Sequence, residues 1–460
     1  MAALASALVL TLTGCASTSE WAAPQVAVPA TWQQAPAASP ADAPQTATAT
    51  LTANPSWWTT LGDPALSGLI EQALQRNGDM VQAAMRVQRA RLVADQAGSD
   101  RLPSVSANVS TSASRALSSG GSTSRAYGAN ASVSWEADLW GRLAAAQSAA
   151  EWEAQATQAD RDGAALSLSV TVAQLYWQLA YLNQRVEASE QSIAYARETL
   201  RLVRAQYEAG AVSGLEIAQA TQSLAAQEAA HTQWLQQRVE ARNALSILFD
   251  GPPGALMQDD DRRLSQADLP PVSAGLPASL LTRRPDLQAS ELRLRKTLAT
   301  VDATRRSYYP TLTLTGSVGS SSSALSEVLR NPVGTLGAGL LLPFIQWRDM
   351  ERNVAISQTD HELAVVAYRQ AWYQALSDVE DALSAQQQYE AQGVQLTTAA
   401  QAARQAERLN EARYRAGAVP LKSWLDAQES RRQAENNLAQ NQLNRLLNRA
   451  TLVQALGGTI

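Results

Sequence analysis

The sequence is poor in the residues from which most enzyme active sites are built. Its 460 residues contain one cysteine, two histidines and two phenylalanines. A single cysteine excludes an intrachain disulfide. The histidines, His231 and His361, stand in different halves of the chain within polar helical sequence, so we expect both to be exposed on helices. There is no glycine-rich phosphate loop and no nucleophile motif. The sequence therefore predicts a protein that is not an enzyme and uses no cofactor.

Runs of basic residues and long apolar segments are also missing. The formal net charge is −5, and nothing marks a nucleic-acid-binding surface. The apolar run from Ala2 to Leu12 is too short to cross a bilayer, so residues 1–14 are interpreted as a signal peptide. Residues 15–55, rich in Ala, Pro, Thr and Gln, are expected to form an extended lead.

Proline is absent from two long stretches. None occurs between Gly141 and Pro252, or between Pro343 and Pro420, so both stretches can form extended helices. In the first, apolar or small side chains recur at alternate spacings of four and three, from Leu168 through Leu182 to Tyr207. This heptad seam predicts a helix that packs along its length against a partner. The matching seam of the second stretch is weaker, with Gln386 and Gly393 interrupting it.

The chain contains an internal repeat. The segment Gln206–Val212 returns as Arg413–Val419, and Tyr207 and Tyr414 stand at the same place in the two copies. The same offset of 207 residues pairs Pro103 with Pro310, Trp140 with Trp347, Asp95 with Asp302, and Ala220 with Ala427. We conclude that the chain is a tandem duplication.

Each copy is predicted to run helix, strand, strand, very long helix, turn, returning helix. The glycine of each turn, Gly210 or Gly417, permits the left-handed conformation that ends a helix. The expected divisions are repeat 1 at 56–250 with strands in 103–136 and a helical hairpin at 141–249, a linker at 251–275, and repeat 2 at 276–460 with strands in 309–343 and a hairpin at 347–448.

The four predicted strands alternate apolar residues with Ser, Thr, Asn or Gly. Segments of about ten residues with this alternation are typical of transmembrane β-barrels. Four strands cannot close a barrel, which needs about eight, so other subunits must complete it. The fold class is therefore mainly α with a transmembrane β part. A small soluble sheet packed on the helices would show the same alternation and stays an alternative.

Two carboxylates, Glu136 and Asp138, precede the first long helix. Their counterparts in the second copy are Pro343 and Ile345. A paired-carboxylate site would thus not be repeated, and we interpret both residues as stabilising the helix start.

Several short motifs carry a resemblance to a known family. The sequence resembles the outer-membrane factor family, the TolC-like exit ducts, and within it the OprM/NodT-type efflux lipoproteins. The motifs are Trp57-Trp58 with Leu61-Gly62-Asp63-Pro64, the segment Val133–Arg142, Arg283-Arg284-Pro285-Asp286-Leu287, Tyr308-Tyr309-Pro310, and the two Tyr-x-x-Gly turns.

The resemblance implies a homotrimer in which three chains supply twelve strands to one outer-membrane barrel. Their long helices would form a periplasmic α-helical barrel. Its partners would be a periplasmic adaptor protein, an inner-membrane transporter and outer-membrane lipid. The cargo would be drugs or other small molecules, with type I protein secretion or metal-ion efflux as alternatives. A lipid-anchored structural coiled-coil protein is an alternative of another class, although it has no use for the strands.

Leu12-Thr13-Gly14-Cys15 resembles a bacterial lipobox, in which the cysteine becomes the lipid-modified first residue of the mature chain. The resemblance therefore implies a covalent lipid on Cys15 and, with Ala16 after it, sorting to the outer membrane. A chance cysteine within an export signal is the alternative.

The family closes its tunnel near the glycine turns with an aspartate-lined gate. Asp426 matches one of these aspartates in position, and Tyr414 is assigned to the same gate. Gly210 and Gly417 are assigned to the turns that dock the adaptor. For Asp426 the alternative is a solvated carboxylate in the first turn of a helix, favoured by the helix dipole.

Overall fold

The structure is a computed structural model. It describes residues 19–34, 56–117, 122–254, 262–264, 277–278 and 283–458. The predicted signal peptide, Cys15 and most of the predicted linker lie outside the described residues.

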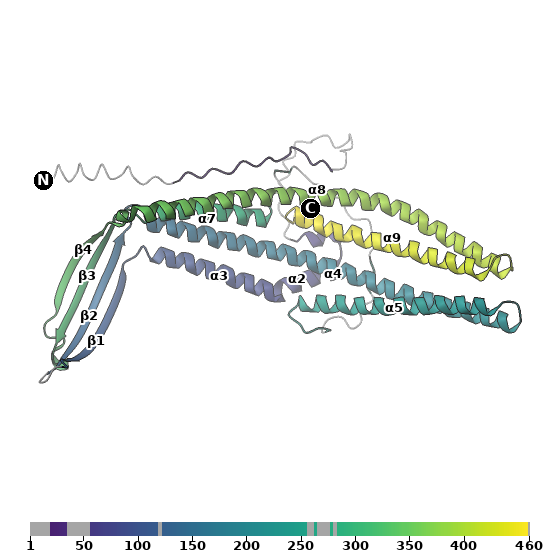
Figure 1. The fold of residues 1–460 in the computed structure, drawn as a ribbon, viewed down its shortest axis with the longest axis horizontal. Helices are drawn as coiled ribbons and strands as arrows, with labels where there is room; N and C mark the ends of the chain where they lie inside the picture. Colours follow the sequence, from purple (N-terminus) through teal and green to yellow (C-terminus); the bar gives the residue numbers. More distant parts are fainter. Residues whose placement is uncertain are drawn as a thin grey trace. The chain divides into compact units, whose positions relative to one another are not determined.

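The two halves of the chain repeat one order of elements (Figure 1). The first half comprises α2 (Pro64–Arg76), α3 (Gly78–Ser99), β1 (Ser104–Arg115), β2 (Thr123–Ala137), α4 (Arg142–Glu208) and α5 (Gly214–Ile247). The second comprises α7 (Pro285–Arg306), β3 (Thr311–Ser322), β4 (Val333–Leu341), α8 (Trp347–Arg415) and α9 (Leu421–Ala455). The long helices α4 and α8 contain 67 and 69 residues. The predicted duplication and the mainly α fold class are confirmed.

The chain divides into two compact units. The first contains Met1–Val26, Ala84–Asp160 and Asp286–Ala371. The second contains Ala27–Ala83, Arg161–Pro285 and Trp372–Ile460. All four strands therefore belong to the first unit, and both glycine turns belong to the second.

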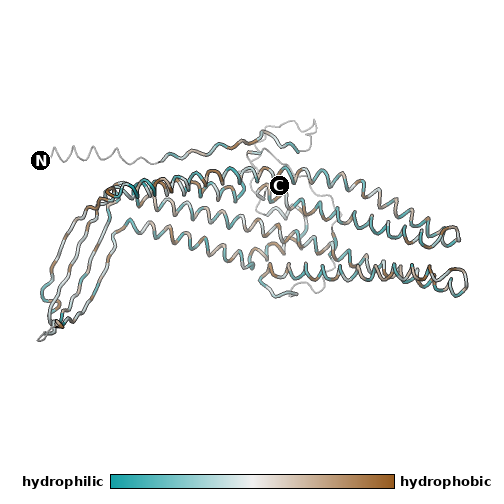
Figure 2. Tube along the Cα trace, viewed as in Figure 1, coloured by the Kyte–Doolittle hydropathy of each residue, from teal (hydrophilic) through white to brown (hydrophobic). Residues whose placement is uncertain are grey.

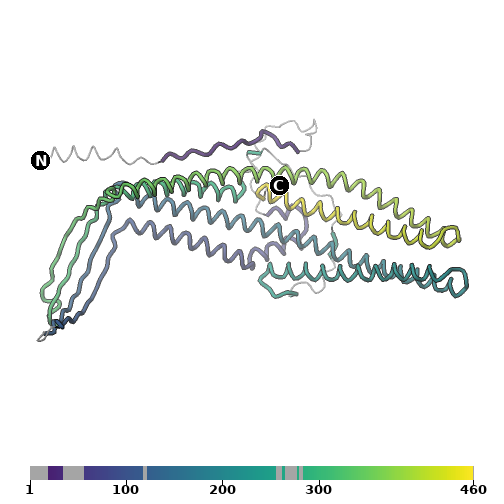
Figure 3. Tube along the Cα trace, in the orientation of Figure 1, coloured from purple at the N-terminus to yellow at the C-terminus, as the bar shows by residue number. Residues whose placement is uncertain are grey.

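The strands form one antiparallel sheet in the order β1-β2-β3-β4. The middle pair, β2 and β3, joins the two repeats (Figure 3). In its register Trp135 lies opposite Leu314. Every residue of β1 and of β4 is exposed, including large aliphatic side chains such as Val109 and Leu336. These exposed strands contradict the alternative of a small sheet packed on the helices. In the described part of the chain, β1 and β4 each have an edge without a partner strand.

The two carboxylates before α4 fix the start of that helix. Asp138 accepts hydrogen bonds from the backbone N–H groups of Leu143 and Ala144 at 3.1 and 2.9 Å. The guanidinium of Arg142, the first residue of α4, binds the Glu136 carboxylate at 2.8 Å. The Asp138 carboxylate satisfies two backbone N–H groups at the helix N-terminus, and the Glu136 carboxylate neutralises the charge of Arg142 there. The interpretation of both residues as stabilising the helix start is confirmed.

A core in the second unit holds α2 against α4. Trp57 is fully buried, and its indole N–H donates to Ser169 Oγ at 2.9 Å. Asp63 caps α2 through two backbone N–H groups and accepts a hydrogen bond from Tyr176 Oη at 2.7 Å. Burial, reinforced by Asp63, raises the pKa of the Tyr176 phenol to about 12. The Asp63 carboxylate therefore caps α2 and also binds a core side chain of α4.

The heptad seam of α4 is buried along most of its length. Val172, Leu182 and Val203 are buried, whereas Tyr207, the last predicted seam position, is 49% exposed. Tyr207 was thus wrongly included, because the helix ends one residue later and none of the described residues buries its side chain. The helices mix hydrophobic and hydrophilic residues (Figure 2). Within the described ranges, none of them combines the length and the apolar character needed to cross a membrane.

The weak seam of α8 has a structural cause. Asn441 of α9 is buried against α8, where it donates to Tyr389 O at 3.1 Å and to Gln392 Oε1 at 2.8 Å. A Cβ on Gly393 would lie 2.9 Å from the Asn441 side-chain oxygen. Gly393 therefore makes room for a hydrogen-bonded polar contact in place of an apolar one.

The prediction that both histidines are exposed is wrong. Each is partly buried. His231 Nδ1 lies 2.7 Å from Ser189 Oγ, and His361 Nδ1 lies 2.9 Å from Thr297 Oγ1. Burial lowers the pKa of His361. Because these helices pack along their whole length, they partly cover side chains at the edge of the contact. Polar neighbours in the sequence therefore did not imply that the histidines are exposed.

Candidate gate and docking turns

The two glycine turns have the same backbone geometry. Gly210 has φ of 73°, and Gly417 has φ of 72°. In the first turn Gly210 N donates to Tyr207 O at 2.9 Å, and Ala211 N donates to Gln206 O at 2.8 Å. The second turn repeats both bonds at the same distances. These paired bonds form a Schellman motif, which requires the left-handed conformation that glycine adopts readily. The structure thus places both predicted turn residues where a long helix reverses.

The helices that follow the turns start differently. Ser213 caps α5 in a capping box, with its hydroxyl accepting from Leu215 N at 3.2 Å and Glu216 accepting from Ser213 N at 2.9 Å. Pro420 precedes α9 and supplies no side-chain cap. The duplication therefore preserves the turns but not the helix starts.

Next to the turns, a tip cluster joins the two hairpins. It consists of six buried side chains: Leu200, Val203, Ala220, Tyr414, Leu421 and Trp424. Tyr414, 7% exposed, stacks on Trp424 with ring centroids 5.2 Å apart. Its hydroxyl donates to Gln206 Oε1 at 2.6 Å, which links α8 to α4. Burial raises the pKa of Tyr414, so the phenol keeps the proton that it donates.

A second polar link between α4 and α8 lies further from the turns. Tyr195 Oη of α4 is 3.1 Å from a carboxylate oxygen of Glu407 and 3.1 Å from one of Glu411, both on α8. Glu407 also pairs with Arg431 of α9 at 3.4 Å. Burial and the two carboxylates raise the pKa of Tyr195, so its hydroxyl is a donor at physiological pH.

The sequence reading missed this second link. Tyr195 stands beside the seam position Ala196, and the repeat offset pairs it with Ala402. Many other polar residues also occur in only one copy, such as Ser192 and Thr199, so the comparison of the copies does not single out Tyr195.

Asp426 lies apart from the tip cluster. Its carboxylate is 63% exposed and is paired with Lys422 Nζ at 2.9 Å on the same helix. Asp426 is therefore solvated, as the alternative interpretation expects, but α9 begins at Leu421, so the residue lies in the second turn of the helix and not in the first. An exposed pair of this kind contributes less than about 1 kcal/mol. The structure does not join Asp426 to Tyr414 by any hydrogen bond or ion pair among the described residues.

The N-terminal lead contacts the second unit through its backbone. The Glu380 carboxylate accepts hydrogen bonds from Gln33 N at 2.7 Å and from Gln34 N at 3.0 Å. Gln387 donates to Gln34 O at 2.7 Å, and Trp32 is buried. The lead is therefore held by specific contacts. The predicted lipid site, Cys15, lies outside the described residues.

Comparison with known proteins finds one family across most of the chain. The outer membrane efflux protein family matches residues 69–249 and 276–458, one segment in each repeat. Together these segments exceed half of the chain.

Individual relatives agree with the family match. A pyoverdine export outer membrane protein, OpmQ of Pseudomonas putida, is 33% identical over 94% of this chain and 92% of its own. A probable efflux pump outer membrane protein, TtgC of the same species, is 28% identical over 97% of this chain and 93% of its own. The open-state MtrE outer membrane channel of Neisseria gonorrhoeae superposes with a TM-score of 0.80 at 29% identity, covering 96% of this chain and 98% of that one.

Proposed function

This chain belongs to the outer membrane efflux protein family and is the outer-membrane channel component of an efflux system, and we propose that it acts as a passive homotrimeric exit duct. Members of the family are channels, not enzymes, and the proposed duct has no catalytic step and no cofactor. Its cargo would be drugs or other small molecules that an inner-membrane transporter delivers through a periplasmic adaptor.

One observation carries the proposal of a trimer. The sheet exposes the apolar side chains of β1 and β4 and leaves an edge of each without a partner strand in the described chain. Exposed strand edges pair readily with other chains. Three copies would contribute twelve strands to one closed barrel, with aliphatic residues such as Val109 and Leu336 facing outer-membrane lipid.

The proposed duct has an anchor, docking turns and a gate. A covalent lipid on Cys15 would anchor the chain, with the long helices extending into the periplasm. The turns at Gly210 and Gly417 would dock the adaptor, because they are exposed and rigidly shaped. Tyr414 would hold the gate closed through Gln206 and Trp424. Asp426, exposed near the second turn, would line the passage.

Deleting the gene from its host tests the efflux function. We expect the deletion strain to accumulate dyes, detergents or antibiotics, and a plasmid copy to restore their export. Measured intracellular concentrations of a panel that includes metal ions, together with a secreted-protein assay, would separate the three kinds of cargo. Unchanged levels of every compound, with altered cell-envelope integrity, would favour the structural coiled-coil alternative.

Replacing Asp426 tests the gate assignment. We expect Asp426→Ala to raise the single-channel conductance of the purified protein in planar bilayers about two-fold or less, since removing an exposed carboxylate changes local charge more than packing. Lys422→Ala removes the pairing cation and serves as the matched control: if the change in local charge sets the conductance, this variant should move it in the opposite direction to Asp426→Ala. Identical conductance in all three proteins would remove Asp426 from the passage.

A further inference from the structure

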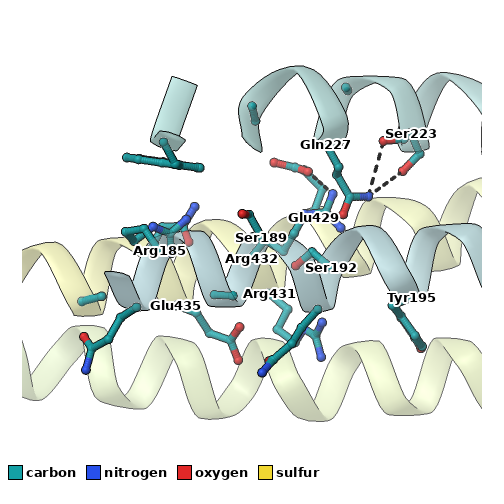
Figure 4. Close-up of a pocket in the computed structure, with 18 of the residues that line it drawn as sticks. Arg185, Ser189, Ser192, Tyr195, Ser223, Gln227, Glu429, Arg431, Arg432 and Glu435 are labelled. Atoms are coloured by element: carbon teal, nitrogen blue, oxygen red, sulfur yellow. Dashed lines mark hydrogen bonds and ion pairs between the residues drawn. The ribbon is translucent and has the colours of Figure 1, made fainter. Parts of the chain in front are cut away.

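A cavity of about 750 Å³ lies within the second unit beside the helical hairpins. Residues of α4, α5 and α9 form most of its wall, and Arg404 of α8 completes it (Figure 4). This volume lies within the range of sites that hold small organic molecules.

Most of the charges around the cavity are paired. Three of its four arginines have a carboxylate partner in the second unit. The pairs are Arg404 with Glu435 at 2.6 Å, Arg431 with Glu407 at 3.4 Å, and Arg432 with Glu429. The fourth arginine, Arg185 of α4, has no hydrogen bond or ion pair among the described residues. The Glu435 carboxylate acts on Arg185 at a distance, but it is the ion-pair partner of Arg404, so the four arginines share three carboxylates and one positive charge is in surplus.

Arg185 is buried and held in a fixed orientation. It is 8% exposed, and its Nε is buried without a hydrogen-bond partner. The guanidinium carbon lies 4.8 Å from the centre of the Trp234 ring of α5, a cation–π contact. Burial lowers the pKa of Arg185, but a guanidinium stays charged at neutral pH. A buried charge is costly unless it is paired, so this one is suited to accept an anion.

The rest of the wall is neutral. Gln227, also 8% exposed, has a buried side-chain oxygen without a hydrogen-bond partner. Ser192 supplies a hydroxyl, and Ala188 and Ala226 supply apolar surface beside the Trp234 indole. The cavity thus combines one buried surplus cation with paired charges, side-chain amides and hydroxyls, and a smaller apolar surface formed by Trp234 and several alanines.

We propose that this cavity binds a small organic monocarboxylate, with the carboxylate on Arg185 and the apolar body beside Trp234. The flat fork of a guanidinium matches the two oxygens of a carboxylate. One surplus positive charge selects a single negative charge. A ligand in the cavity contacts α4 and α5 of one hairpin and α9 of the other, so it would stabilise their pairing.

Binding is tested on the full-length protein in detergent, with 4-fluorobenzoate as the probe. Its ¹⁹F resonance should shift and broaden with the wild-type protein, whereas 4-fluorobenzamide, of the same shape without the charge, should bind at least about tenfold more weakly. Equal binding of the two compounds, or no binding of the acid at millimolar concentration, would overturn the proposal without the need for any variant.

Substitutions locate the site. Arg185→Gln should weaken binding of 4-fluorobenzoate at least about tenfold, and Arg185→Lys should restore part of it, because a lysine keeps the charge and loses the fork. The matched control is Arg197→Gln, which removes an exposed arginine of the same helix, paired with Glu228 at 2.7 Å outside the cavity. It should leave binding unchanged. An affinity lost equally in both Gln variants would show nonspecific attraction of the anion.

Discussion

Tyr414→Ala is expected to open the proposed gate. The substitution removes a buried ring, its stack on Trp424 and its hydrogen bond to Gln206. Truncating a buried aromatic side chain costs about 3 to 5 kcal/mol. If only the closed state contains these contacts, the closed-to-open ratio falls by a factor of about 100 or more. We expect a several-fold rise in mean single-channel conductance and sensitivity of the cells to antibiotics too large to enter otherwise.

The duplication supplies the control for this experiment. Tyr207 occupies the same place in the first repeat, yet it is 49% exposed. Tyr207→Ala should therefore leave the conductance unchanged. Tyr414→Phe keeps the stack and loses one hydrogen bond, worth about 1 kcal/mol, so it should produce an intermediate effect. Equal effects of the two alanine variants, or a Tyr414→Ala protein that forms trimers with normal conductance, would refute the gate.

The difference between Tyr207 and Tyr414 shows which features could be predicted from the sequence and which could not. Both turns could be predicted, because their glycines meet a backbone requirement that does not depend on the surroundings. Burial of Tyr414 depends instead on a distant side chain. Trp424 stacks on it, whereas the repeat offset places Ile217 at that position of the first hairpin. The sequence contains this difference, but only the packing shows that it concerns the tyrosines.

The strands and seams show the same limit. Alternation of polar and apolar residues predicted four strands, since it depends on neighbours in the chain. Pairing of β2 with β3 connects residues from different repeats, and the alternation does not specify the partner. From the sequence, Gly393 only interrupts the apolar seam of α8. In the structure, the Asn441 side chain fills the space beside it. Local patterns thus gave the elements, while polar contacts between helices required the structure.

Glu407→Ala is expected to destabilise the joined hairpins more than any other charge removal among the pairs described above. Glu407 is 3% exposed and interacts with Tyr195 and Arg431. Its removal leaves the Arg431 charge without its carboxylate, and the Nε of Arg431 is already buried without a hydrogen-bond partner. Breaking a fully buried ion pair on one side costs about 3 to 5 kcal/mol, and we expect a smaller loss here because the Arg431 side chain is 26% exposed. We expect a lower thermal midpoint of the purified protein and a raised open probability.

A double substitution tests whether this destabilisation comes from the unpaired Arg431 charge or from the lost hydrogen bond with Tyr195. If the unpaired cation causes it, Glu407→Gln with Arg431→Gln should be more stable than Glu407→Gln alone, since removing both charges restores neutrality. Glu198→Gln, which breaks an exposed pair with Arg201, should leave the thermal midpoint unchanged. If the double variant is no more stable than the single one, the Tyr195 hydrogen bond, and not the ion pair, carries the contribution of Glu407. That outcome would make Tyr195→Phe as damaging as Glu407→Ala, whereas an ion-pair origin predicts that Tyr195→Phe is mild.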